Sequence, residues 1–311
     1  MNEMLQRKIG GSYWETSAVA LGIMRMAALT PTKAAEVLET AIESKINFID
    51  SADMYGGGKS EEIFGAALKE ANITRDQLYI QSKGGIVTGD EKRYDFSKQH
   101  LLDSVDGILE RMGIDYLDSY LLHRPDPLME PEEIAEAFDL LQASGKVRHF
   151  GVSNFNPEQF QLLQSHVDQK LLINQLQFSI MHTGMIDYGM HTNMTDTRSF
   201  DHDGGILEFS RRKKVTIQAW SPFQYGFFEG VFVDNDKFPE LNELLAKLAK
   251  KYNTNKNAIA TAWILRHPAN MQVILGTMNP TRIKESAAGA DVSLTKQEWY
   301  DVYFAAGNDL P

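Results

Sequence analysis

The sequence contains no cysteine. This absence excludes disulfide frameworks, thiolate metal sites and cysteine nucleophiles, and it suits a reducing compartment such as the cytoplasm. Long hydrophobic runs are also missing. No segment reaches the length of a membrane-spanning helix, and the N-terminal residues include no stretch of signal-peptide type. We therefore expect a cytoplasmic protein without a membrane partner.

The sequence has fewer basic residues than acidic ones. The 31 Lys and Arg residues are outnumbered by 42 Asp and Glu residues, which gives a net charge of −11. Such a charge is poorly suited to the phosphate backbone of nucleic acids, so no nucleic-acid partner is expected. Low-complexity tracts and long Pro/Gly linkers are absent as well. We expect residues 1–311 to form a single domain.

What the chain does contain is a regular alternation of short apolar strands and helices. A hairpin with its turn at Gly10-Gly11 is predicted first, and eight strands follow at 18–23, 46–49, 78–82, 116–122, 147–152, 171–175, 215–220 and 272–275. Helices are predicted to begin at Thr30-Pro31, Ser60, Ser97, Pro131, Asn156-Pro157, about 238, about 256 and Asn279-Pro280. A capping box at Thr295 to Glu298 predicts one extra C-terminal helix.

This alternation is typical of an α/β protein, and two architectures compete for it. A doubly wound open sheet normally carries a G-x-G-x-x-G turn directly after a strand, and no such turn occurs at any strand end here. A closed parallel (β/α)8 TIM barrel needs no such turn. The sequence therefore predicts the barrel, with the N-terminal hairpin and the extra C-terminal helix as additions.

Polar residues follow nearly every predicted strand. In barrels of this type the working residues lie at the carboxyl ends of the strands. A site is therefore expected where these residues meet: Asp50, Lys83, His123, Ser153-Asn154, Gln175, Trp220-Ser221 and Gly276-Thr277.

Four residues near these ends suggest a reaction. A nearby Lys83 ammonium is expected to stabilise the phenolate of Tyr55 and so lower its pKa, with Asp50 holding the lysine. A neutral His123 could position a carbonyl oxygen beside the tyrosine. A carbonyl that receives a proton in this way needs a nucleophile. Because the chain lacks cysteine and an obvious metal triad, a hydride from a cofactor is an attractive candidate.

The sequence resembles the aldo-keto reductases over essentially its full length. The resemblance is carried by six motifs, each at a predicted strand end: Asp50-Ser51-Ala52-Asp53-Met54-Tyr55-Gly56, Gln81-Ser82-Lys83, Asp118-Ser119-Tyr120-Leu121-Leu122-His123, Gly151-Val152-Ser153-Asn154-Phe155, Asn174-Gln175 and Trp220-Ser221-Pro222. It implies an NAD(P)H-dependent reductase of small carbonyl compounds, a monomer or weak homo-oligomer, with Asp50, Tyr55, Lys83 and His123 as its catalytic tetrad and Tyr55 as the proton donor.

The resemblance also implies the coenzyme site. Ser153, Asn154 and Gln175 would hold the nicotinamide carboxamide, Trp220 would lie against the nicotinamide, and Ser221 would reach the pyrophosphate. The remaining expected coenzyme residues are Pro222, Gly276, Thr277, Arg282 and Ser286. Family members often carry a lysine for the 2′-phosphate at the position of Gly276. Arg282 remains, so NADPH is favoured and NADH is possible.

Substrate preference stays open. Residues 181–205 are expected to form a long polar loop that maps onto no substrate, and Met24, Arg25 and Met26 stand where many relatives have an aromatic residue. Histidines and aspartates in and near this loop match no compact ligand spacing, so no metal is expected. Gly58-Lys59-Ser60 resembles the end of a P-loop, but position 53 holds Asp53 and not the required glycine.

Two other functions compete with the reductase. One is a barrel that binds the nucleotide chiefly as a regulatory module, as the channel-associated relatives of the family do. The other is a lyase in which Lys83 forms a Schiff base with a carbonyl.

Overall fold

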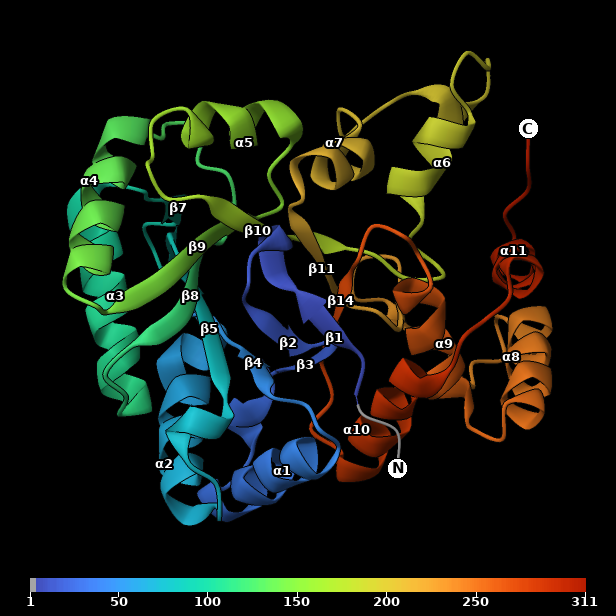
Figure 1. Cartoon of the computed structure of the whole chain (residues 1–311), viewed down its shortest axis with the longest axis horizontal. Helices are drawn as coiled ribbons and strands as arrows, with labels where there is room; N and C mark the ends of the chain where they lie inside the picture. Colours follow the sequence, from blue (N-terminus) through green and yellow to red (C-terminus); the bar gives the residue numbers. More distant parts are fainter. Residues whose placement is uncertain (1–3) are drawn as a thin grey trace.

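A computed structural model of the chain describes residues 4–311, and its centre is a closed barrel of eight parallel strands. Around the barrel the strands follow the order β10, β11, β14, β3, β4, β5, β8 and β9 (Figure 1). Their bounds are β3 (Val19–Gly22), β4 (Phe48–Asp50), β5 (Tyr79–Gly84), β8 (Leu117–Leu122), β9 (Val147–Ser153), β10 (Leu171–Gln177), β11 (Thr216–Trp220) and β14 (Gln272–Leu275). The predicted barrel and all eight of its strands are confirmed.

Helices surround the barrel, as Figure 1 shows. They are α1 (Pro31–Glu43), α2 (Lys59–Glu70), α3 (Lys98–Met112), α4 (Pro131–Ala143), α5 (Pro157–Gln164), α7 (Ile206–Lys213), α9 (Lys256–Leu265) and α10 (Pro280–Ala287). Three further helices add to this ring: α6 (Gly184–Met190), α8 (Pro239–Lys251) and the predicted C-terminal α11 (Lys296–Ala305). No helix within residues 4–311 is long and apolar enough to cross a membrane.

Most of the predicted N-terminal capping residues cap their helices as expected. The Thr30 side chain accepts a hydrogen bond from the Lys33 amide, and Asn156 and Thr295 each form a full capping box. Ser97 is the exception, because its side chain does not cap α3. Its amide and its hydroxyl both donate to Asp95 Oδ1, at 3.1 and 2.7 Å, so the aspartate two residues earlier organises this turn.

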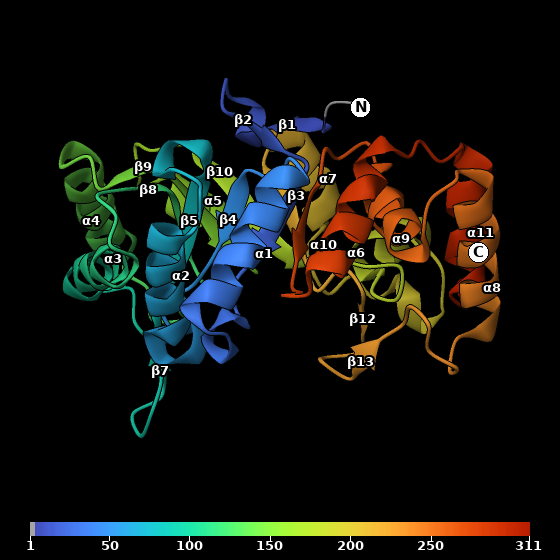
Figure 2. The same ribbon diagram turned by 90° about the horizontal axis from the view of Figure 1, so that it is seen from below.

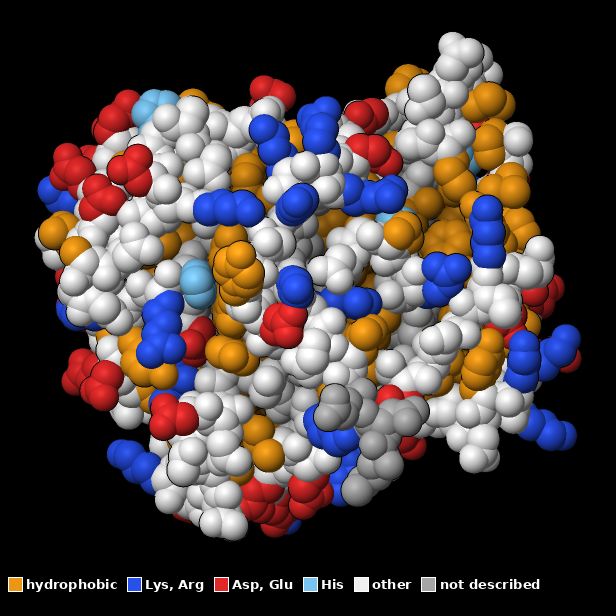
Figure 3. Space-filling model, in the orientation of Figure 1, with side chains coloured by type: hydrophobic (Ala, Val, Ile, Leu, Met, Phe, Trp, Pro, Cys, Tyr) orange, Lys and Arg blue, Asp and Glu red, His pale blue; other side chains and the backbone are white. Residues whose placement is uncertain are grey.

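The N-terminal hairpin of β1 (Gln6–Lys8) and β2 (Glu15–Ser17) is confirmed, and it lies at one end of the barrel (Figure 2). Its turn passes through Gly10 and Gly11 with φ of 59° and 63°, a conformation that glycine adopts without strain. Figure 3 views this end of the molecule, where acidic and basic side chains both occur across the face. The carboxyl ends of the barrel strands point the other way.

The opposite end of the barrel carries two small hairpins that the sequence did not reveal (Figure 2). They are β6 (Ile86–Val87) with β7 (Arg93–Tyr94), and β12 (Gln224–Tyr225) with β13 (Gly230–Val231). The segment 181–205, predicted as a long polar loop, contains one short α-helix. Helix α6 lies within it and buries Ile186 and Asp187, and the carboxylate of Asp187 accepts a hydrogen bond from the Tyr303 hydroxyl of α11 at 2.7 Å.

The interior of the barrel contains buried glutamines where such barrels usually pack branched apolar side chains. Gln81 and Gln175 both donate to Asp50 Oδ1, at 2.7 and 2.9 Å, and both also donate to the side-chain oxygen of Gln218. Gln218 in turn donates to Gln272 Oε1 at 2.8 Å. A chain of amides therefore leads from the middle of the barrel to Asp50.

The amide chain continues to the hairpin end. The side-chain amide of Gln272 donates to Thr16 Oγ1 at 3.0 Å and to the Ser17 carbonyl at 2.7 Å. Because buried amides are costly unless they are hydrogen-bonded, these contacts account for a polar core in this barrel.

Candidate active site

Tyr55 is placed by a tight turn that follows β4. The turn Tyr55–Gly58 has three consecutive glycines, Gly56, Gly57 and Gly58, with φ of 60°, 63° and 89°. At Gly56 a Cβ atom would lie 2.8 Å from Ala27 Cβ, so a side chain there would need both a strained backbone and more room. The glycines after Tyr55 therefore let the chain reverse immediately behind the tyrosine.

Lys83 lies beneath this turn with its ammonium fully surrounded. Its Nζ is 2.9 Å from Asp50 Oδ2, 2.6 Å from the Ser51 carbonyl and 3.3 Å from the Tyr55 hydroxyl, and the residue is 0% exposed. Such complete burial alone would lower the pKa of Lys83, but the Asp50 carboxylate and the Tyr55 hydroxyl raise it above its ordinary value. The lysine is therefore a permanent cation beside the phenol.

Gly84, the residue after Lys83, is packed too closely against its neighbours to carry a side chain. A Cβ atom on Gly84 would lie 2.1 Å from the Tyr120 hydroxyl and 2.2 Å from Ser104 Oγ. The Gly84 carbonyl also accepts a hydrogen bond from the His123 amide at 3.0 Å. The end of β5 and the loop that carries His123 are thereby joined.

His123 faces Tyr55 across the site. The two ring centroids are 5.8 Å apart and the planes are nearly perpendicular, at 83°. Burial, together with the positive charges of Lys83 and Arg124, lowers the pKa of His123 well below its ordinary value. The Nδ1 atom is buried and finds no hydrogen-bond partner within residues 4–311. A neutral imidazole with unused hydrogen-bonding capacity therefore stands beside the phenol.

Lys83 lowers the pKa of Tyr55, as expected, but burial outweighs its effect. Burial raises the pKa of the Tyr55 hydroxyl above that of an ordinary phenol, and the attraction of Lys83 opposes this rise only in part. The negative charge of Asp50, on the far side of the lysine, adds to the rise. Tyr55 is therefore a protonated phenol throughout the neutral pH range.

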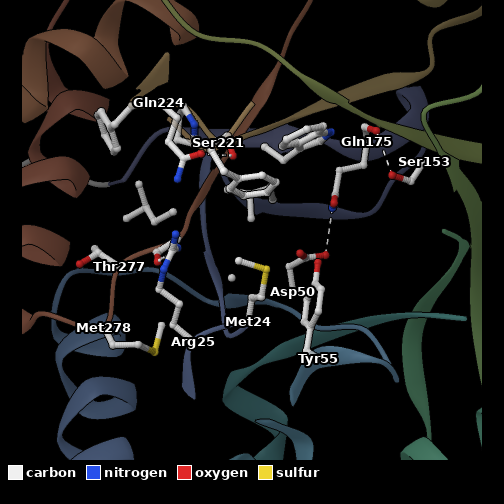
Figure 4. Close-up of a pocket in the computed structure, with 18 of the residues that line it drawn as sticks. Met24, Arg25, Asp50, Tyr55, Ser153, Gln175, Ser221, Gln224, Thr277 and Met278 are labelled. Carbon is white, nitrogen blue, oxygen red and sulfur yellow. Dashed lines mark hydrogen bonds between the residues drawn. The ribbon is translucent and has the colours of Figure 1, made fainter. Parts of the chain in front are cut away.

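One cavity of about 820 Å³ joins these groups to the predicted coenzyme residues (Figure 4). Asp50, Tyr55 and His123 line it, while Lys83 lies behind them. All the residues expected at the coenzyme line it too: Ser153, Asn154, Gln175, Trp220, Ser221, Pro222, Gly276, Thr277, Arg282 and Ser286. In Figure 4, Tyr55 and Asp50 occupy one end of the view and Thr277 and Met278 the other.

Hydrogen bonds order the wall beside Tyr55. Ser153 Oγ donates to the Gln175 carbonyl at 3.1 Å, and the Gln175 side-chain amide donates to Asp50 Oδ1 (Figure 4). Asn154, in a left-handed conformation with φ of 61°, accepts a hydrogen bond from Trp220 Nε1 at 3.2 Å. Strained backbone of this kind concentrates at functional sites. The Gln175 amide nitrogen is thus already engaged with Asp50, which leaves its oxygen as the atom facing an incoming group.

The far end of the cavity is positively charged. The N-cap Asn279 accepts a hydrogen bond from the Arg282 amide at the start of α10, so that helix terminus adds its own partial positive charge to the arginine. Arg25, whose role the sequence left open, donates from Nη1 to the Gly276 carbonyl at 2.7 Å. Both arginines line the cavity, which suits a ligand with phosphate groups.

A second buried layer supports Asp50 and Lys83, and no motif in the sequence indicated it. Glu61 Oε1 accepts hydrogen bonds from Ser51 at 3.3 Å and Ser82 at 2.8 Å, the residues next to Asp50 and Lys83. Its Oε2 is 2.8 Å from Arg111 Nη2. Burial raises the pKa of Glu61, and the bonds to Ser82 and Arg111 oppose that rise. Only the three-dimensional packing of α2 and α3 brings these groups together.

Residues 4–311 contain no group of three or more His, Asp or Glu side chains placed to hold a metal ion. In the 181–205 segment, His191 Nδ1 lies 2.8 Å from Asp196 Oδ2, and Asp201 and Asp203 accept hydrogen bonds from backbone amides. These side chains therefore stabilise local turns by hydrogen bonds within the segment.

The chain is similar to known proteins over nearly its whole length. Residues 18–303 match the family model described as "Aldo/keto reductase family". A 6-dehydroglucose reductase of Agrobacterium fabrum is 36% identical over 94% of this chain and 95% of its own. Among solved structures, the thermostable aldo-keto reductase Tm1743, bound to the inhibitor epalrestat, superimposes with a TM-score of 0.77 at 26% identity and covers 97% of this chain and 100% of its own.

A more distant aldo-keto reductase from Klebsiella pneumoniae, solved in complex with NADPH, has a TM-score of 0.76 at 23% identity over 97% of this chain and 94% of its own. At that identity the likeness speaks to the fold. The family model and the 36% identical relative both extend over nearly the whole chain. The chain belongs to the aldo/keto reductase family and is an oxidoreductase.

Proposed function

We propose that the chain reduces the carbonyl group of a small aldehyde or ketone with NADPH, and that Tyr55 supplies the proton. The observation that carries the proposal is the 3.3 Å contact between Lys83 Nζ and the Tyr55 hydroxyl at the wall of the cavity, with the His123 ring facing the same tyrosine. NADPH, when bound, supplies the hydride to the carbonyl carbon.

The residues present fit this coenzyme. Arg282 and the N-terminus of α10 would take the adenosine phosphates, and Ser221 and Arg25 would take the pyrophosphate. Ser153, Asn154 and the free oxygen of Gln175 would hold the carboxamide, and Trp220 would lie against the ring. Gly276 and Thr277, with Pro222 and Ser286 nearby, complete the same wall.

Each member of the tetrad would have a distinct task. His123, whose lowered pKa keeps the ring neutral, would donate a hydrogen bond that orients the carbonyl oxygen. Tyr55 would transfer its proton to that oxygen as negative charge develops there. Lys83 would stabilise the resulting phenolate, and Asp50 would fix the lysine in place.

The geometry disfavours a Schiff-base lyase. Such a lysine must be unprotonated and must reach the substrate. The pKa of Lys83 is raised, its ammonium contacts Asp50, Ser51 and Tyr55, and it does not line the cavity. Borohydride is therefore expected to trap no substrate on this chain.

Steady-state assays with the full chain test the proposal. NADPH oxidation is followed with aldehydes, ketones and quinones, and aldehyde sugars belong in the panel because one relative is named a 6-dehydroglucose reductase. We expect turnover of at least one simple aldehyde. Tight NADPH binding without turnover of any compound would instead favour a regulatory nucleotide-binding module.

The pH dependence of reduction follows from two pKa shifts. Reduction needs Tyr55 protonated and His123 neutral. Because the pKa of Tyr55 is raised, its proton is lost only above about pH 10, and because the pKa of His123 is lowered, its ring gains a proton only well below about pH 6.5. We expect kcat/KM to be level across neutral pH and to fall in the alkaline range. A pH–rate profile with a midpoint near 6.5 would contradict the neutral imidazole.

Coenzyme choice is tested at Arg282. We expect Arg282→Ala to weaken NADPH binding by about tenfold or more, because one charge-assisted hydrogen bond to a phosphate is lost, and to leave NADH binding nearly unchanged. Fluorescence titration with both coenzymes measures this. Arg212→Ala, an exposed arginine on α7 that does not line the cavity, is the matched control. Equal losses for both coenzymes would mean that Arg282 does not contact the 2′-phosphate.

A further inference from the structure

Arg124 directly follows His123 at the carboxyl end of β8 and lines the cavity. Its guanidinium carbon lies 5.8 Å from the centroid of the Trp220 ring. Its charge acts on both Tyr55 and His123, since it lowers the pKa of each. Arg124 therefore borders the place where a substrate carbonyl would meet Tyr55.

Apart from the Trp220 ring, the guanidinium of Arg124 has no partner within residues 4–311. Four other arginines within residues 4–311 are half-buried, and each donates hydrogen bonds to a carbonyl or a carboxylate: Arg7, Arg75, Arg111 and Arg198. Arg124 is equally half-buried, and within the same residues it makes neither a hydrogen bond nor an ion pair. A cation withdrawn from water without a partner is costly. A bound ligand would relieve that cost.

The coenzyme does not require this arginine. Arg25 and Arg282 serve the proposed phosphate end, beside β14. In the closed barrel, three strands separate β14 from β8 in either direction, so Arg124 lies on the opposite side of the rim. The one acidic residue that lines the cavity is Asp50, which is already paired with Lys83. No acidic side chain of the cavity wall is left to neutralise Arg124.

We propose that Arg124 selects carbonyl substrates that carry oxygen atoms able to accept hydrogen bonds close to the reacting carbonyl, as a carboxylate or a pair of neighbouring hydroxyl groups does. The inference rests on the proposed reductase function. A guanidinium offers donors in a planar fork and no acceptor, and two adjacent oxygens match that fork.

The test compares three aldehydes of similar size: succinic semialdehyde with a carboxylate, glyceraldehyde with a diol, and butanal with an apolar chain. The readout is the ratio of kcat/KM for each oxygenated aldehyde to kcat/KM for butanal. The effect of Arg124 on Tyr55 and His123 is common to all three substrates and cancels in this ratio. We expect Arg124→Leu to lower both ratios by about tenfold or more, the loss of a charged hydrogen-bond donor.

Two further variants sharpen the result. Arg124→Lys keeps the charge but not the fork, so the ratio for succinic semialdehyde is expected to survive in part and the ratio for glyceraldehyde to fall as in Arg124→Leu. Arg212→Leu, which removes an exposed arginine of α7 that does not line the cavity, is the matched control and should leave both ratios unchanged. NADPH affinity is measured for every variant.

Unchanged ratios in Arg124→Leu would overturn the inference while leaving the reductase intact, because butanal would still be reduced. Weakened NADPH binding with constant ratios would also overturn it and would assign Arg124 to the coenzyme. If the unmodified chain binds NADPH but reduces none of the three aldehydes or any wider panel, the proposed function itself fails, and this inference fails with it.

Discussion

Tyr55→Phe is expected to lower the rate of carbonyl reduction by about 10²- to 10⁴-fold, the usual contribution of a positioned general acid. The substitution removes one hydroxyl and keeps the ring that lines the cavity. Without that hydroxyl, the developing alkoxide has no proton donor, and Lys83 cannot replace it because its ammonium lies behind the tyrosine and does not line the cavity. NADPH affinity should therefore be nearly unchanged.

The measurement pairs single-turnover kinetics with coenzyme titration, so that loss of chemistry is separated from loss of binding. Tyr252→Phe provides a matched control, because its hydroxyl donates to Glu298 and the Ser293 carbonyl, away from the cavity. If Tyr55→Phe kept a tenth or more of the activity of the unmodified chain, another group would have to be the acid.

Lys83→Met is expected to damage both catalysis and stability. Loss of the ammonium leaves Asp50, which is only 3% exposed, as an uncompensated buried charge, and the free energy of unfolding should fall by about 3–5 kcal/mol. Reduction should fall by at least about 10²-fold, because the Tyr55 phenolate loses the cation that stabilises it.

The two effects of this variant can be separated. In the double variant Lys83→Met/Asp50→Asn, the leftover charge is gone and Gln81 and Gln175 can still donate to the remaining side-chain oxygen. Urea denaturation should show recovered stability, while the assay should show no recovered activity. Recovery of activity together with stability would mean that Lys83 acts only as a structural partner of Asp50.

The sequence was sufficient for the parts of the fold that depend on short segments. Proline at the first helical turn and a capping side chain before it predicted α1 and α5, and the apolar strands predicted the barrel. The incorrect prediction at Ser97 also concerns a short segment. At Ser97 two neighbouring groups compete for the helix start, and Asp95 prevails because its carboxylate is the stronger acceptor.

Within segment 181–205, helix α6 was missed for a different reason. The segment is polar in composition, and α6 is only seven residues long, too short for a helical period to stand out. What stabilises α6 is contact with a distant element, the bond between Asp187 and Tyr303. The sequence pattern of one segment cannot predict a contact with a helix more than 100 residues away, such as that between Asp187 and Tyr303.

The candidate site also contains residues that the sequence identified and residues that it did not. Most residues of the expected tetrad and coenzyme site lie at or shortly after strand ends, a position that the sequence identifies, and all of them except Lys83, which lies behind the wall, line one cavity. Glu61, Arg25 and Arg124 could not be placed in this way, because their roles depend on which strands are neighbours. The pKa of Tyr55 likewise depends on burial, which no motif reports.

The row of glutamines through the barrel has a consequence for how this protein can change over time. Gln218 accepts hydrogen bonds from Gln81 and Gln175 and donates one to Gln272. The orientation of each amide therefore determines the orientation of the next. Replacing one member with leucine would strand its neighbours without partners, at about 1–3 kcal/mol for each orphaned group. Descendants of this sequence should therefore keep the row intact or exchange several members at once, and variants that arrive one substitution at a time should be rare.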